Sequence, residues 1–155
     1  MGAFFTWLEA TSIAIVVKDS LLLTAGLSAV HVLGMTLITG GAFVSNMRLL
    51  GVLLASDDLA TITRAAGRGL SVGLMLSVTS GLPLFMARAT AASVNPTFRT
   101  KMLILVAASL FQFTVHHWAS QDVANRRALR LVGAMGLCLW VGVATAGVYY
   151  ILLGE

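Results

Sequence analysis

The stretch that decides the fold runs from residue 20 to residue 47 and reads SLLLTAGLSAVHVLGMTLITGGAFVSNM. Its 28 residues include no Asp, Glu, Lys or Arg. A helix of about 20 apolar residues crosses a hydrocarbon core about 30 Å thick, because each residue adds 1.5 Å. Three further uncharged stretches, 69–87, 102–121 and 131–153, hold 19, 20 and 23 residues. We therefore predict four transmembrane helices at 20–47, 69–87, 102–121 and 131–153.

The composition excludes a soluble domain. Hydrophobic residues make up 58% of the 155 residues and charged residues only 10%, whereas a typical soluble domain is about 25% charged. The ten basic and six acidic residues all lie outside the four stretches, which disfavours a charge-relay transporter. The basic residues flank apolar stretches, which indicates lipid phosphates rather than nucleic acid as their partner. We expect an all-α fold, a transmembrane four-helix bundle that forms a single integral membrane domain over 1–155.

The N-terminal segment has a different pattern. Only eight residues separate Glu9 from Lys18, too few to span a bilayer. Aromatic Phe4, Phe5 and Trp7 mix there with polar residues, which predicts an interfacial amphipathic helix over 3–17. Six basic residues follow the first and third predicted helices and four lie on the other side. The positive-inside rule then places both termini outside the cytoplasm.

Small residues recur at every fourth position in two predicted helices. The two series are Gly69, Gly73, Ser77 and Gly81, and Ala134, Cys138, Gly142 and Ala146. Such ridges allow another helix to approach closely. They would also form a flat wall against a planar cofactor such as haem. We expect close helix contacts along both ridges.

Three histidines are the main ionisable groups inside the predicted spans: His31, His116 and His117. Ionisable residues are costly in lipid, which favours a functional role. A neutral imidazole is a good ligand for haem iron. Ser28 and Gly34 lie one turn from the first histidine and are expected to leave room for a large group beside it. We predict His31 and His116 as the iron ligands.

A polar stripe supports the choice of His116 over its neighbour. The stripe consists of Ser109, Gln112, His116 and Ser120. Its three- and four-residue steps predict that it faces the bundle interior. His117 points about 100° away from it and precedes Trp118, a residue type common at membrane interfaces. We keep His117 as the alternative ligand.

The depths of the two histidines leave two arrangements open. Measured from one end of their helices, His31 and His116 differ in depth by about 5 Å, and from the other end by about 10 Å. The pair therefore either shares one haem or belongs to two separate sites. A third reading needs no cofactor, because an intramembrane histidine can simply bond a neighbouring helix.

The order of several motifs resembles a known group of proteins. These are HVLG at 31–34, NMRLLG at 46–51, GLM at 73–75, TSG at 79–81 and NPTF at 95–98, followed by Lys101 and His116. From the N-terminal segment to about His117, the chain resembles a bacterial family of four-helix membrane proteins of unknown function. That family is distantly similar to CopD-like copper-resistance domains and HemJ-type protoporphyrinogen oxidases. The resemblance implies the bacterial inner membrane as the location, and the distribution of basic residues then predicts periplasmic termini.

The resemblance also implies roles for several residues. In the CopD-like and HemJ-type relatives, an early histidine and an Arg at the helix end are associated with haem or metal, which indicates His31 and Arg48 here. The family pattern usually has Asp where this chain has Asn46, which can still hydrogen-bond Arg48. Arg48 lies about 25 Å along the helix from His31, so it suits a haem near His116 or serves as a phospholipid anchor. Arg99 and Lys101 are better placed for the propionates of a haem on His31.

These observations lead to three functional hypotheses. The first is a b-type cytochrome-like protein that holds one or two haem b groups and transfers electrons between a quinone and a partner protein. The second is a cofactor-free packing subunit of a larger membrane complex, or a homo-oligomer. The third is an oxidoreductase of haem biosynthesis that acts on a porphyrinogen.

Overall fold

The computed structural model describes residues 2–116 and 125–153. Every regular element in these two ranges is helical. In chain order they are α1 (Gly2–Glu9), α2 (Ser12–Asp19), α3 (Leu21–Leu50), α4 (Leu59–Met86), α5 (Ala89–Val94), α6 (Pro96–Phe111), the π-helical segment η1 (Gln112–His116) and α8 (Arg126–Leu153). The expected all-α fold is therefore confirmed for the described part of the chain.

Capping residues set the ends of the long helices. The Ser20 side chain accepts a hydrogen bond from the backbone N–H of Leu23 at the start of α3. At its end, Gly51 has a φ of 77°, a left-handed conformation that glycine adopts without strain. Asp58 caps α4 in the same way as Ser20 caps α3. The helices continue past the uncharged stretches because a charged side chain at a membrane edge does not interrupt the backbone hydrogen bonds.

Three of these helices, α3, α4 and α8, are long and apolar enough to cross a membrane. They contain the predicted spans 20–47, 69–87 and 131–153 almost completely. The fourth predicted span, 102–121, falls on α6 and η1, and α6 has only 16 residues before the backbone becomes π-helical. Residues 117–121 lie outside the described part of the chain. The described residues thus contain three candidate spans, and a four-helix bundle is not confirmed.

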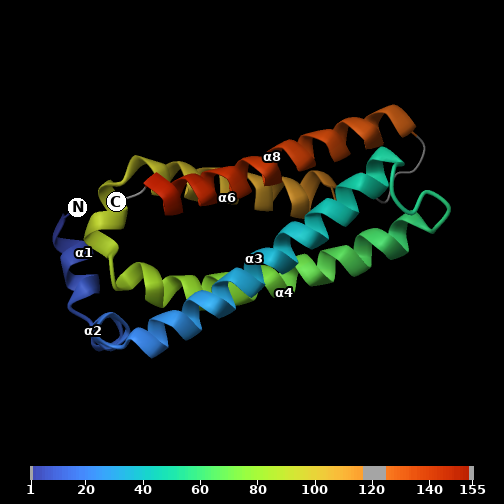
Figure 1. Cartoon of the computed structure of the whole chain (residues 1–155). Coiled ribbons are helices and arrows are strands. Elements are labelled where there is room, and N and C mark those ends of the chain that lie inside the picture. Colours follow the sequence, from blue (N-terminus) through green and yellow to red (C-terminus); the bar gives the residue numbers. More distant parts are fainter. Residues whose placement is uncertain (1, 117–124, 154–155) are drawn as a thin grey trace.

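The long helices run alongside one another, and α1, α2 and α5 gather at one end of them (Figure 1). Helix α3 packs on α4 and on α8, and α6 packs on α8. The core lies where these helices meet and consists of Ile38, Ala42, Leu70, Ala108, Trp140 and Val143. The chain enters α1 and leaves α8 at the same end of the molecule.

The N-terminal segment forms two short helices rather than the single helix predicted over 3–17. The chain breaks at Ala10 and Thr11, and the Thr11 hydroxyl accepts the backbone N–H of Ala14 at 3.4 Å, which starts α2. A threonine hydroxyl can accept a hydrogen bond from a backbone N–H a few residues later in the chain. This bond competes with the hydrogen bonds of a continuous helix, so a new helix can begin there. The Glu9 carboxylate accepts the backbone N–H of Thr90 at 2.8 Å and so ties α1 to α5.

Candidate functional site

His31 lies on α3 at the interface with α4, half-buried. Its Nδ1 is 2.9 Å from the backbone carbonyl oxygen of Ser77. A carbonyl oxygen can only accept, so Nδ1 carries the proton and donates it. The Ser80 hydroxyl lies 3.4 Å from the same nitrogen. The neutral imidazole therefore keeps its lone pair on Nε2, the arrangement that a metal-binding histidine requires.

Two glycines define the space around the imidazole. A Cβ atom on Gly81 would lie 2.9 Å from Cε1 and 3.0 Å from Nδ1 of His31, so the ring occupies the place where a side chain would be. A Cβ on Gly34 would lie 2.6 Å from the Ser77 hydroxyl and 2.8 Å from the Gly73 carbonyl oxygen. The expected room beside His31 at Gly34 is therefore filled by α4. A bound group could reach His31 only from another side.

The small-residue ridge of α4 makes the contact that its spacing predicted. Gly73 and Ser77 are buried against α3, and a Cβ on Gly73 would lie 2.6 Å from the Gly34 carbonyl oxygen. A Cβ on Gly69, at the other end of the ridge, would meet no atom within 4 Å. The ridge of α8 differs, because Ala134 and Cys138 are exposed.

Two basic residues lie at the His31 end of the molecule. Lys101 on α6 is half-buried, close enough for its charge to act on His31, and its Cε lies 3.8 Å from where a Cβ on Gly147 would be. Arg99, two residues earlier, is exposed. At the same end of the molecule, Phe85 stacks on Phe98 with ring centroids 5.4 Å apart.

The other two histidines cannot be placed in the same detail. The backbone of His116 ends η1, but its side chain lies outside the described part, as does the whole of His117. Gln112, one turn before His116, is buried and accepts a hydrogen bond from the Trp140 indole N–H at 3.2 Å. At this position the polar stripe faces the bundle interior, as predicted.

The helix contacts fix the relative levels of His31 and His116. His116 follows four residues after Gln112, which bonds Trp140 of α8, so its backbone is near the level of Gly136. On α3 the residue at that level is Asn46, which packs on Gly136 and lies 15 positions after His31. The backbones of His31 and His116 therefore differ in level by roughly 20 Å along the helices.

Arg48 lies in the last turn of α3, 17 positions after His31. It lines a cavity of about 230 Å³ together with Arg126 and Arg130 of α8. The expected hydrogen bond from Arg48 to Asn46 is not found. Arg48 donates instead to the Asp57 carbonyl oxygen at 2.5 Å, and the Asn46 amide donates to Ala42 at 2.7 Å.

Two features of this region are not predicted from the sequence. Arg126 and Arg130 are four residues apart, which places them on one helix face, but their meeting with Arg48 depends on how α3 and α8 pack. Asn46 is fully buried, and its Oδ1 has no hydrogen-bond partner among the described residues. It fits there because Gly133 and Gly136 leave space on α8.

The chain matches a sequence model described as a family of unknown function (DUF6644) over residues 4–152. No curated protein and no solved structure matches it. These comparisons therefore lend no support to the expected likeness to CopD-like and HemJ-type proteins. The site must be interpreted from its own geometry.

Proposed function

The chain belongs to the DUF6644 family, whose function is unknown, and we propose that it is a b-type cytochrome-like membrane protein with His31 as an axial haem ligand. One observation carries this proposal. The Ser77 carbonyl oxygen holds Nδ1–H of His31 at 2.9 Å, so Nε2 is the nitrogen left to bind iron. Such a second hydrogen bond fixes both the tautomer and the orientation of a ligating imidazole.

The surroundings of His31 favour a porphyrin over a metal ion bound by protein side chains alone. Among the described residues, no group of three His, Cys, Asp or Glu side chains could hold a metal ion. A porphyrin supplies four nitrogen ligands itself and needs only axial ligands from the protein. Lys101 and Arg99, at the same end, would pair with its propionates. When bound, the haem would supply one-electron chemistry suited to exchange with a quinone or a partner protein.

The spacing of the histidines favours two separate sites over one shared haem. Axial ligands of one iron must lie at the same level, whereas the backbones of His31 and His116 differ by roughly 20 Å along the helices. We therefore assign His31 to its own site. His116 would serve a second haem at the level of Arg48.

An absorption spectrum of the purified full-length protein tests the proposal. Protein from cells able to make haem should give a reduced b-type spectrum with bound iron. His31→Ala should remove its own haem and leave any His116-dependent signal intact, and His116→Ala should do the reverse. The control Thr39→Ala changes an exposed polar residue of the same helix and should leave the spectrum unchanged. A colourless protein without iron would contradict the proposal.

One observation favours the packing-subunit or homo-oligomer hypothesis as a second candidate. The small residues Ala134 and Cys138 on α8 are exposed in the described chain. Outward small residues allow close approach of a helix from another protein or a second copy. Cross-linking through the native Cys138 in membranes tests this candidate. A cross-linked dimer that Ala134→Leu abolishes supports the homo-oligomer, a monomer under all conditions contradicts it, and a cross-link to another protein supports the packing subunit.

A further inference from the structure

We propose that the cavity lined by Arg48, Arg126 and Arg130 binds the phosphate groups of an anionic phospholipid. The cavity lies about 25 Å from His31 along α3, because Arg48 is 17 positions further along that helix. It is therefore separate from the proposed haem site at His31. Its volume of about 230 Å³ is far above the roughly 10–15 Å³ that one water molecule needs.

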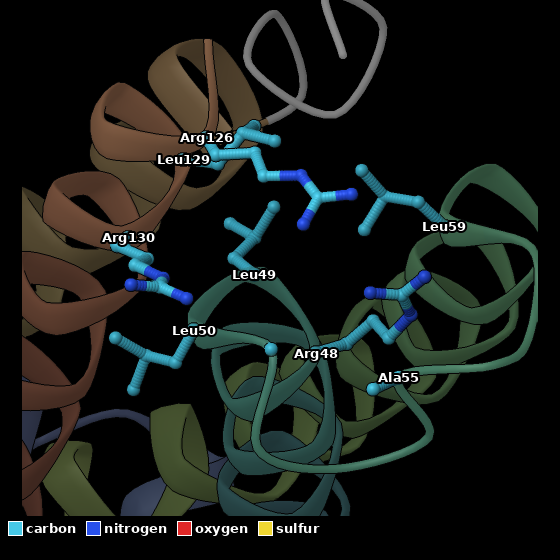
Figure 2. Close-up of a pocket in the computed structure, with 9 residues that line it drawn as sticks. Arg48, Leu49, Leu50, Ala55, Leu59, Arg126, Leu129 and Arg130 are labelled. Atoms are coloured by element: carbon cyan, nitrogen blue, oxygen red, sulfur yellow. The ribbon is translucent and has the colours of Figure 1, made fainter.

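Three arginine side chains from two helices surround the same opening (Figure 2). Arg48 comes from the last turn of α3, and Arg126 and Arg130 come from the first two turns of α8. A guanidinium group presents five N–H donors in a planar fork that matches phosphate oxygens in pairs. Three such groups around one cavity provide a multiple-donor phosphate site.

Arg48 is held in position by the connection between α3 and α4. It donates to the Asp57 carbonyl oxygen at 2.5 Å, and its Nε is buried without a hydrogen-bond partner among the described residues. A buried donor without an acceptor costs free energy. An anion in the cavity would offset this cost, because it brings acceptor oxygens to the guanidinium group.

Part of the cavity lining is apolar. Leu49, Leu59 and Leu129 line it and are only 4%, 7% and 7% exposed, since they pack together as one cluster. A site lined by both basic groups and buried leucines suits a molecule with a charged head and an apolar body. A phospholipid has both a charged head and an apolar body, whereas a free inorganic anion has only the charge.

The charge balance favours a ligand with more than one negative charge. Among the described residues, no carboxylate forms an ion pair with the three arginines, and the nearby Asp58 carboxylate is engaged by the Thr61 hydroxyl at 2.7 Å. The Asn125 side chain already accepts the backbone N–H groups of Arg127 and Ala128. The guanidinium groups, rather than the helix N-terminus, would therefore hold the anion. A lipid with two phosphates, of the diphosphatidylglycerol type, fits best.

The position of the cavity agrees with a lipid as its source. It lies where two candidate membrane-spanning helices, α3 and α8, reach their ends. Phospholipid headgroups gather at this level of a bilayer. Basic pockets between membrane helices commonly bind such headgroups.

Native mass spectrometry of the full-length protein released from detergent tests the proposal. Four probes are compared: diphosphatidylglycerol, phosphatidylglycerol, phosphatidylcholine and inorganic phosphate. We expect diphosphatidylglycerol to bind most tightly and phosphatidylcholine to bind least. Equal binding of these two lipids would overturn the proposal. So would a result in which inorganic phosphate displaces the bound lipid completely, because the ligand would then be a soluble anion.

Matched variants assign the binding to this cavity. Arg126→Gln with Arg130→Gln should weaken diphosphatidylglycerol binding about a hundredfold, on the scale of two charge-assisted hydrogen bonds. Arg127→Gln removes one positive charge from an exposed neighbour that does not line the cavity and should change binding by less than about twofold. All variants must show the wild-type unfolding temperature without lipid. An equal loss from Arg127→Gln would overturn the assignment. The lipid comparison on the wild-type protein remains decisive if the double variant fails to fold.

Discussion

The Nδ1 atom of His31 and the carbonyl oxygen of Ser77 are joined by a 2.9 Å hydrogen bond across the α3–α4 interface. Ser77 contributes its backbone carbonyl to this bond, and its own hydroxyl is buried against Gly34 without a hydrogen-bond partner among the described residues. The bond forms because small residues on both helices let their backbones come into contact. The orientation of the histidine thus depends on the packing of two helices.

Replacing Gly81 by Ala should displace the His31 ring. The added methyl group would lie 2.9 Å from Cε1 and 3.0 Å from Nδ1, so the imidazole must move away from Ser77. We expect a loss of about 1–3 kcal/mol in the free energy of unfolding, as for other overpacked sites, together with weakened haem binding. Denaturation in detergent and titration with haem measure the two effects.

The control is Gly69→Ala, at the start of the same ridge. A Cβ there meets nothing within 4 Å, so the substitution should be neutral or stabilise the helix by about 0.5–1 kcal/mol. Equal behaviour of the two variants would show that the imidazole does not lie against Gly81.

Replacing Gly73 by Ala should separate α3 from α4. The new Cβ would lie 2.6 Å from the Gly34 carbonyl oxygen and 2.7 Å from the Ile38 backbone nitrogen. Backbone atoms cannot rotate away, so we expect a cost at the upper end of about 1–3 kcal/mol or beyond it. Thermal unfolding in detergent is the measurement, with Gly40→Ala, which has open space, as the matched change on α3. A Gly73→Ala protein as stable as wild type would contradict the close contact.

Replacing Gln112 by Leu should leave the Trp140 indole N–H without an acceptor. Both residues are buried and their bond is 3.2 Å long. An unpaired buried donor costs about 1–3 kcal/mol, so the unfolding temperature should fall. Thr114→Ala, two residues away and exposed, should change it little. A shift in the near-ultraviolet signal of Trp140 would report the same loss, and an unchanged signal and stability would refute it.

The Asp58 cap of α4 should make a pH-dependent contribution. Hydrogen bonds from the Thr61 hydroxyl and backbone N–H lower the pKa of Asp58 below its ordinary value of 3.8. Because the folded-state pKa is lowered, the contribution is complete above pH 3.8 and is lost as the pH falls through the folded-state pKa. Asp58→Ala should lower the unfolding temperature slightly at about pH 7, and the difference from wild type should vanish in acid. A difference that persists in strong acid would contradict this assignment.

Three of the four predicted spans coincide with candidate membrane helices among the described residues, because the absence of charge marks a membrane segment. The ends are less predictable, since Arg48, Arg64 and Arg68 lie within helices rather than after them. The break at Thr11 needs a capping hydroxyl, which hydrophobic patterning does not reveal. The fourth predicted span is not confirmed, since α6 gives way to η1 within it, and the π-helical hydrogen-bond pattern leaves no trace in composition.

The two small-residue ridges show why spacing alone does not fix packing. On α4 the four-residue row meets α3 at Gly73 and Ser77, as expected. On α8 the buried face follows alternating steps of four and three, through Leu129, Gly133, Gly136, Trp140, Val143 and Gly147. Residues at every fourth position follow a line that is inclined to the helix axis. A neighbouring helix that runs nearly parallel to α8 therefore contacts residues spaced alternately by four and three positions. The pattern of side chains in the sequence does not predict the hydrogen bond from His31 to a backbone carbonyl oxygen.

The short connection between α3 and α4 implies an order of assembly. Residues 51–58 join the two helices, whereas Asn46 and Gly136, which touch across α3 and α8, are 90 positions apart. Loop-closure entropy rises by about 0.6 kcal/mol for each doubling of length, so the first pairing is easier by about 2 kcal/mol. Helices α3 and α4 would therefore pair as a hairpin while the rest of the chain is still entering the membrane. His31 would acquire its orientation at this first step, before α6 and α8 complete the molecule.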